Sequence, residues 1–256
     1  MMNEKELLEW YLSVGVDAFC GDVPFVAENK QSTIKETDKI SSDVRPAITD
    51  LAQMSSTACK NARELCEKAQ TLEELRKAVD NFDGCSLKLN AKNTVFGEGD
   101  EQAKILFVGE APGADEDRTG QPFVGKCGQL LDKILQSVGL ERSKCYITNL
   151  VMWRPPGNRT PTDAEIAVCL PFLKRKIELI NPDVIVALGA PAANVLLDAE
   201  ESISKIRGKW LEYNMRPGVS VPLLPTFHPA YLLRNPAQKA KTWSDFLRLA
   251  KKIFNN

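Results

Sequence analysis

Three polar side chains with different chemistry follow apolar stretches of the chain: Glu110, Asn149 and His228. A carboxylate such as Glu110 can orient a water molecule or accept a proton. The Asn149 amide carries both a donor and an acceptor, so it can read a ligand edge that presents both. His228 is the only histidine in the chain, and an imidazole can donate to an oxygen that gains negative charge. The structural alternatives are a turn cap, a loop contact and a core histidine.

Phe123 and an acidic run stand near the first of these residues. Phe123 lies in GQPFVG, where the flanking Pro and Gly allow either a core position or a platform that stacks on a base. Residues 115–117, Asp-Glu-Asp, follow Glu110, and the simplest interpretation of Asp115 is a solvated acid.

Two segments could contact a nucleic acid. The loop RPPGNR, with Arg154 and Arg159, is rigid and basic, and is either a phosphate contact or an exposed connector. After the histidine, Leu232 and Leu233 stand beside Arg234. This pattern suits an apolar wedge in a base stack with the arginine on a phosphate, and burial of the leucines under the last helix is the alternative.

The elements that position these residues are apolar strands alternating with helical patterns. Strands are expected over 104–110, 145–151, 184–189 and 221–228, and helices over 122–139, 161–180, 190–199 and 238–254. Strands that are apolar throughout predict a sheet covered on both faces. The fold class expected is therefore a three-layer α/β/α with a central four-stranded parallel sheet. Ligands of such sheets bind beyond the carboxyl ends of the strands, where Glu110, Asn149 and His228 converge.

The first third of the chain has a different pattern. It predicts a helix over 3–19, a polar linker over about 28–46, and helices over 48–69 and 71–81. The helix expected over 71–81 begins T-L-E-E, a capping-box pattern that starts at Thr71. We therefore expect a helical N-terminal extension over 1–81 and an α/β domain over 82–256.

Charge is distributed unevenly along the 256 residues, although the net charge is only −1. Residues 1–84 hold 10 Lys and Arg against 16 Asp and Glu, and the remaining residues hold 23 against 18. A mildly basic body is compatible with DNA binding or with ordinary solvated charge. The sequence has no apolar run long enough for a membrane span and no secretory or transit pattern at its start, so we expect a cytoplasmic protein.

The chain has seven cysteines, an odd number, and no CxxC motif. Without a secretory signal, this favours reduced thiols over a disulfide framework. They are Cys20, Cys59, Cys66, Cys85, Cys127, Cys145 and Cys169.

Five segments in this order resemble the motif set of the family-four uracil-DNA glycosylases, which carry a [4Fe-4S] cluster: GEAPGADED, GQPFVG, YITN, RPPGNR and HPAYLLRNP. The resemblance covers about residues 82–243. It implies a glycosylase that hydrolyses the N-glycosidic bond of uracil in single- or double-stranded DNA during base excision repair.

The resemblance assigns roles to individual positions. Glu110 and Ala111 match the loop that contacts uracil and positions the attacking water, and Phe123 matches the ring that stacks on the flipped base. Asn149 matches the amide that reads the uracil edge, and His228 matches the histidine that faces uracil O2. By the same resemblance, Leu232 and Leu233 lie in the segment that probes the DNA.

The cysteines depart from the family pattern. The four positions that hold the cluster in the family read Phe82, Cys85, Trp153 and Cys169 in this chain. Family resemblance thus implies a [4Fe-4S] cluster with Cys85 and Cys169 among its ligands, while two of the four positions are aromatic and offer no ligand. The residues favour an aromatic pair that fills the volume of the cluster. Cys59 and Cys66 remain as possible substitute ligands.

Two further functions stay open. One is a glycosylase of the same fold with a different or broader base preference, such as hypoxanthine. The other is a DNA- or nucleotide-binding module without catalysis, which the joint presence of Glu110, Phe123, Asn149 and His228 disfavours.

Overall fold

The computed structural model of this chain describes residues 48–254, with side chains described from residue 56 onward. The helix expected over 3–19 and the linker expected over 28–46 lie outside the described residues. No helix among the described residues has the length and apolar character needed to cross a membrane.

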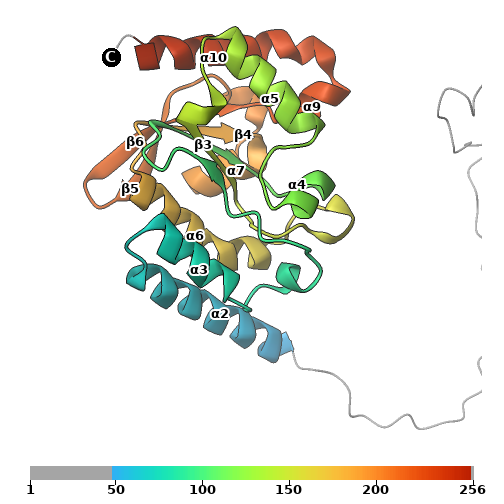
Figure 1. The fold of residues 1–256 in the computed structure, drawn as a ribbon, viewed down its shortest axis with the longest axis vertical. Helices are drawn as coiled ribbons and strands as arrows, with labels where there is room; N and C mark the ends of the chain where they lie inside the picture. Colours follow the sequence, from blue (N-terminus) through green and yellow to red (C-terminus); the bar gives the residue numbers. More distant parts are fainter. Residues whose placement is uncertain (1–47, 255–256) are drawn as a thin grey trace, which may run out of the picture. The chain divides into compact units, whose positions relative to one another are not determined.

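A single mixed sheet of the described residues has the strand order β1-β3-β2-β4-β6-β5 (Figure 1). β3, β2, β4 and β6 pair in parallel, which confirms the predicted four-stranded parallel core. β1 and β5 add antiparallel strands at the two edges. The strands are β1 (Glu98–Gly99), β2 (Ile105–Gly109), β3 (Cys145–Asn149), β4 (Val184–Leu188), β5 (Leu211–Arg216) and β6 (Val219–Thr226).

The two edge strands are absent from the sequence prediction for different reasons. β1 has two residues, too few to form a pattern. β5 forms a hairpin with β6 around Gly218, which adopts a left-handed φ of +77°. Buried and exposed residues alternate along part of β5, and the turn residues Pro217 and Gly218 follow it. This hairpin signal was present in the sequence.

Helices cover both faces of the sheet, as the three-layer prediction requires. Figure 1 shows α5 and α10 on one side of the sheet and α6, α3 and α2 on the other. The helices are α2 (Ile48–Lys68), α3 (Leu72–Asp80), α4 (Ala114–Thr119), α5 (Lys126–Ser137), α6 (Asp163–Ile180), α7 (Ala190–Leu197), α8 (Ile203–Ile206), α9 (Pro229–Arg234) and α10 (Lys239–Phe254), with short 3₁₀ turns at Ser86–Leu89, Arg142–Lys144, Pro156–Asn158 and Pro236–Gln238.

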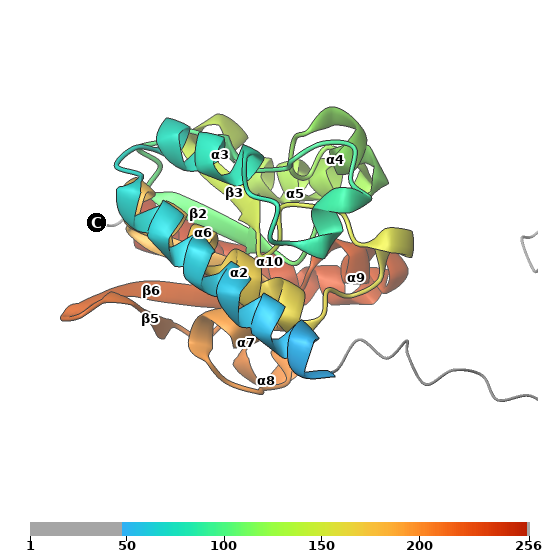
Figure 2. The same cartoon turned by 90° about the horizontal axis from the view of Figure 1, so that it is seen from below.

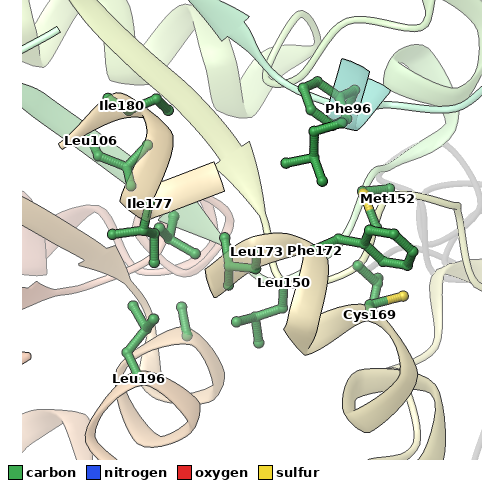
Figure 3. Close-up of a cluster of buried hydrophobic side chains, with 14 of the residues drawn as sticks. Phe96, Leu106, Leu150, Met152, Cys169, Phe172, Leu173, Ile177, Ile180 and Leu196 are labelled. Atoms are coloured by element: carbon green, nitrogen blue, oxygen red, sulfur yellow. The ribbon is translucent and has the colours of Figure 1, made fainter. Parts of the chain in front are cut away.

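The two faces of the sheet bury separate apolar clusters because successive side chains of a strand point in opposite directions. On one face, Leu106 of β2 belongs to the cluster that α6 fills with Phe172 (Figure 3). On the other face, Phe107 stacks on Phe246 of α10 with the ring centroids 6.0 Å apart. The buried layers fix the sheet and therefore its carboxyl edge.

The helices α2 and α3 pack against α6. Figure 2 shows α2 lying over α6. α3 begins as expected, because the Thr71 hydroxyl accepts a hydrogen bond from the Glu74 amide at 3.1 Å. Ala62 of α2 and Leu75 of α3 are fully buried in the same apolar cluster as the sheet. The division of the chain into an extension over 1–81 and a domain over 82–256 stays a prediction.

Candidate active site

The carboxyl ends of the parallel strands border a cavity of about 750 Å³. Gly109 ends β2 and pairs in register with Asn149, which ends β3. β6 ends at Thr226, two residues before the histidine. Figures 1 and 2 place α4 and α9 at the same end of the sheet, and residues of both line the cavity. The predicted pocket residues all line it: Glu110, Ala111, Phe123, Asn149 and His228.

The His228 ring has a fixed hydrogen-bonding arrangement. It is the N-cap of α9, and its Nδ1 accepts from the backbone amide of Ala230 at 3.1 Å. Burial, with a smaller contribution from the nearby Arg234, lowers the pKa of His228 to about 4, and Glu116 opposes the shift. The imidazole is therefore neutral at pH 7 and carries its proton on Nε2. This leaves a neutral donor at the cavity.

Asn149 presents an unused acceptor. The residue is 2% exposed, and its Oδ1 is buried with no hydrogen-bond partner among the described residues. A Cβ added to Gly109 would lie 2.4 Å from this oxygen, so glycine leaves the room that the amide occupies. A buried acceptor without a partner costs roughly 1–3 kcal/mol, and a ligand donor would remove that cost.

Phe123 lies between the strand ends and the histidine. Its ring centroid is 5.7 Å from that of His228, at an interplanar angle of 41°. A Cβ on Gly109 would lie 2.7 Å from the edge of the Phe123 ring. Phe123 also has a φ of +53°, which a bulky side chain rarely adopts. An unusual backbone conformation at a cavity marks a position where geometry matters more than local stability.

Glu110 follows β2 and is the carboxylate that lies next to the strand end. Burial raises its pKa, and a hydrogen bond from the Thr160 side chain partly offsets that rise. Ala111, the next residue, offers no second carboxylate. Glu110 is thus the residue of this pair that can bind a water molecule.

The loop after β3 is held by its own side chains. Arg159 donates to both carboxylate oxygens of Glu165, at 2.7 and 2.8 Å, and this pairing lowers the pKa of Glu165 to about 2. Arg154 donates from Nε to Asn158 Oδ1 at 2.7 Å. The Arg159 guanidinium thus holds the loop to α6 while the residue also lines the cavity, and its contact with a phosphate stays a prediction.

The two leucines in the segment after His228 differ in exposure. Leu232 is fully buried, whereas Leu233 is 41% exposed. Because a residue in contact with DNA must reach the surface, the burial of Leu232 favours the alternative role in the core, and its contact with DNA stays a prediction. Leu233 remains available, and Arg234 lines the cavity.

Sequence reasoning missed two buried acids in α4. Glu116 is 9% exposed and accepts from the backbone amide of Gly113. Asp117 is 3% exposed and accepts from the Lys92 amide at 2.7 Å. Asp115, by contrast, is exposed and pairs with Arg118, as a solvated acid would. The available signal was a glutamate three residues after Gly113, the position from which its side chain accepts from the N-cap backbone amide.

Comparisons with known proteins agree with this arrangement. The family model "Uracil DNA glycosylase superfamily" matches residues 96–247. The type-4 uracil-DNA glycosylase of Thermotoga maritima is 46% identical over 175 residues, which are 68% of this chain and 89% of that protein. The chain belongs to the type-4 uracil-DNA glycosylase family. The type-4 enzymes of Pyrobaculum aerophilum and Archaeoglobus fulgidus are both 41% identical, and the matches cover 90% and 93% of those proteins.

The type-4 family is known for a [4Fe-4S] cluster. In this chain, Cys85 and Cys169 are buried with their Sγ atoms 3.9 Å apart. The other two cluster positions hold buried aromatic rings. Phe82 contacts Phe172 edge to face at 5.1 Å between ring centroids, and the Trp153 indole is hydrogen-bonded.

These residues do not fit a [4Fe-4S] cluster. Such a cluster takes four ligands, and the aromatic side chains at two of the positions offer none. Among the described residues, no group of three or more His, Cys, Asp or Glu side chains is placed to hold a metal ion. Figure 3 shows Cys169 beside Phe172 and Met152 in the apolar cluster. Cys59 and Cys66, the possible substitutes, lie on α2, and Cys66 is buried with its pKa raised to about 12.

Proposed function

We propose that this type-4 family member removes uracil from DNA by hydrolysing the N-glycosidic bond, which leaves an abasic site. The proposal is carried by the buried Asn149 Oδ1, which has no hydrogen-bond partner within the described part of the chain and lines the same cavity as the neutral His228. The names of the relatives describe the same reaction class.

The Asn149 amide selects uracil by its hydrogen-bonding pattern. Its Oδ1 accepts from uracil N3–H, and its Nδ2 can donate to uracil O4. Cytosine has an unprotonated N3 and an amino group at C4, so it would leave both groups of the amide unpaired. A site built around such a pair rejects the mismatched base strongly.

His228 supports the departure of the base. Breaking the glycosidic bond places positive charge on the sugar and negative charge on uracil O2. The fixed Nε2–H of the neutral ring donates to that oxygen, and one such donor contributes about 3 kcal/mol to transition-state stabilisation. A neutral donor also leaves no cation stranded in a buried site.

Glu110 orients the attacking water, and Phe123 stacks on the base after it has left the duplex. Flipping costs roughly a few kcal/mol, which stacking on an aromatic ring partly offsets. Outside the cavity, Leu233 fills the gap in the base stack and Arg154 contacts a phosphate. Arg234 contacts a phosphate from the cavity wall. Lys126, which lines the cavity, is a further candidate for a phosphate contact.

We also propose that this family member works without a [4Fe-4S] cluster. Phe82 and Trp153 fill the volume with buried aromatic area, and the thiols of Cys85 and Cys169 pack against each other. With four cysteines, metal ligation would stabilise this region. In this chain, burial of the two large aromatic side chains stabilises it instead.

The test of the activity is a panel of substrates for the purified full-length protein. Uracil in single-stranded DNA and in U:G pairs should be excised without added metal, and matched strands with cytosine or thymine should remain intact. Faster excision of hypoxanthine than of uracil would show that hypoxanthine, rather than uracil, is the preferred base. Binding without excision of any base would indicate a DNA-binding module and contradict the proposal.

A further inference from the structure

The backbone at Phe123 adopts a conformation that its own sequence does not favour. With φ at +53°, the residue occupies the left-handed region, where a side chain crowds the backbone. A conformation of this kind persists only when its surroundings hold it. The hydrogen bonds to the peptide groups on either side of Phe123 identify what does so.

Arg142 holds the peptide groups on both sides of Phe123 through their carbonyl oxygens. Its guanidinium donates to the carbonyl of Pro122 at 2.7 Å and to the carbonyl of Phe123 at 3.2 Å. The guanidinium is itself fixed by Glu98 at 3.3 Å and Asp132 at 3.1 Å. A planar fork between two carboxylates leaves little freedom for the carbonyls that it binds.

Glu116 holds the peptide groups on the carboxyl side. Its Oε1 accepts from the amides of Val124 and Gly125, each at 3.0 Å. Its Oε2 accepts from the amide of Gly113 at 3.1 Å, in the loop that follows Glu110. One buried carboxylate therefore joins the loop of Phe123 to the loop of the water-binding residue.

The glycines on both sides leave room for this placement. A Cβ on Gly128 in α5 would lie 1.6 Å from the Phe123 carbonyl oxygen. On the ring side, Gly109 lies under the edge of the Phe123 ring. The backbone and the ring are thus both seated against glycine.

We infer that Arg142, with Glu116, is a positioning residue that fixes the Phe123 ring as a stacking platform. Arg142 is not among the described residues that line the cavity, so it acts through Phe123 rather than on the substrate. Glu116 does line the cavity, so Arg142 gives the cleaner test. The inference rests on the proposed stacking role of Phe123.

The test is a double-mutant cycle with Arg142→Gln and Phe123→Ala, measured by single-turnover uracil excision at saturating enzyme. Arg142→Gln should lower the rate about tenfold in the wild-type background, because the ring loses its fixed position. It should change the rate by less than about twofold when Phe123 is already alanine. Arg142→Lys keeps the charge but loses the planar fork of donors. Its excision rate should lie between that of the wild type and that of Arg142→Gln.

Arg175→Gln is the matched control. Arg175 is 23% exposed against 26% for Arg142, and it also binds a backbone carbonyl, that of Ala69, and a carboxylate, that of Glu178. It belongs to α6 and does not line the cavity. Its replacement should lower the melting temperature about as much as Arg142→Gln while leaving the excision rate within about twofold.

Each other outcome is informative. An equal loss of rate from Arg142→Gln in both backgrounds, or a similar loss from Arg175→Gln, would overturn the positioning role and leave only a structural one. If Arg142→Gln does not fold, the Lys variant in the same cycle gives the answer. A wild-type rate for Phe123→Ala would refute the stacking role of Phe123 and the inference with it. A loss of rate in Phe123→Ala, combined with an additive effect of Arg142→Gln, would refute the inference alone.

Discussion

The Nδ1 atom of His228 accepts a hydrogen bond from the backbone amide of Ala230 at 3.1 Å, so the proton of the neutral ring resides on Nε2. The same ring has a pKa lowered to about 4 by burial. His228 therefore stays neutral over the whole range in which a DNA-repair reaction would run, and protonation of this residue does not limit the rate near neutral pH.

The acid limb of the pH–rate profile should instead belong to Glu110. Burial raises the pKa of Glu110 above its usual 4.5, and only the ionised form is the strong, charged acceptor that orients the attacking water. Because this pKa is raised, the excision rate should drop at a pH above the ordinary glutamate range as the pH falls. Single-turnover rates between about pH 4 and 8 measure this limb. Glu110→Gln should be slow and should lack it, and an unchanged acid limb in that variant would refute the assignment.

Replacing each of the two leucines after His228 should affect a different property of the protein, stability for Leu232 and excision from duplex DNA for Leu233. Leu232→Ala creates a cavity in the core and should lower the free energy of unfolding by roughly 2–5 kcal/mol. Leu233→Ala should leave stability within about 0.5 kcal/mol while it weakens excision from duplex DNA more than from single strands. Urea denaturation and parallel rates on the two substrates check both. Equal rates of Leu233→Ala and wild type on duplex DNA would contradict the wedge.

The cluster positions can be tested by spectroscopy. Protein purified without oxygen should be colourless, with no broad absorbance near 400 nm and little iron, because Phe82 and Trp153 supply no ligands. The double variant Cys85→Ser, Cys169→Ser should fold, with a loss of a few kcal/mol at most from polar groups in an apolar site. A brown preparation with about four irons per chain would show that other cysteines had been recruited.

Lys176 gives a prediction for stability. The residue is fully buried on α6, its ammonium donates to the Phe96 carbonyl and the Thr148 hydroxyl, and desolvation lowers its pKa to about 7. The unfolded chain, with an ordinary lysine pKa near 10.5, binds more protons between pH 7 and 10.5, so stability should rise with pH across that window.

The slope that Lys176 contributes is at most about 1.4 kcal/mol per pH unit. Lys176→Met should remove it and raise stability at pH 7, because the Thr148 hydroxyl still donates to the Phe96 carbonyl. Chemical denaturation of both proteins at a series of pH values measures the difference. Parallel pH dependences of the variant and the wild type would show that Lys176 is not desolvated as described.

The sequence predicted the parallel core and the pocket because each rests on a local pattern. Apolar runs followed by Gly109, Asn149 and Thr226 place strand ends at one edge of the sheet by a general rule of parallel topology. The two-residue strand β1 has no such pattern. β5 does have a local pattern, a partial alternation of buried and exposed residues followed by Pro217 and Gly218.

The unpredicted parts of the site depend on tertiary contacts. Nothing local distinguishes Leu232 from Leu233, because the register of α9 against the core decides which one is buried. Arg159 looks like a phosphate ligand in sequence, and only its bidentate pairing with Glu165 assigns it to the loop. The left-handed Phe123 similarly depends on Arg142, which lies in a different element.

The central claim is that the unpaired Asn149 oxygen reads uracil, and one measurement tests it most directly: single-turnover release of uracil from single-stranded DNA by wild type and by Asn149→Ala. Asn194→Ala is the control, since its Oδ1 accepts from the backbone amide of Glu201 and Asn194 is not among the described residues that line the cavity. The wild type should excise uracil, and Asn149→Ala should be slower by about 30- to 1,000-fold, equivalent to roughly 2–4 kcal/mol, with its fold intact. A folded Asn149→Ala variant with the wild-type rate, or a wild-type protein that releases no uracil, would contradict the account.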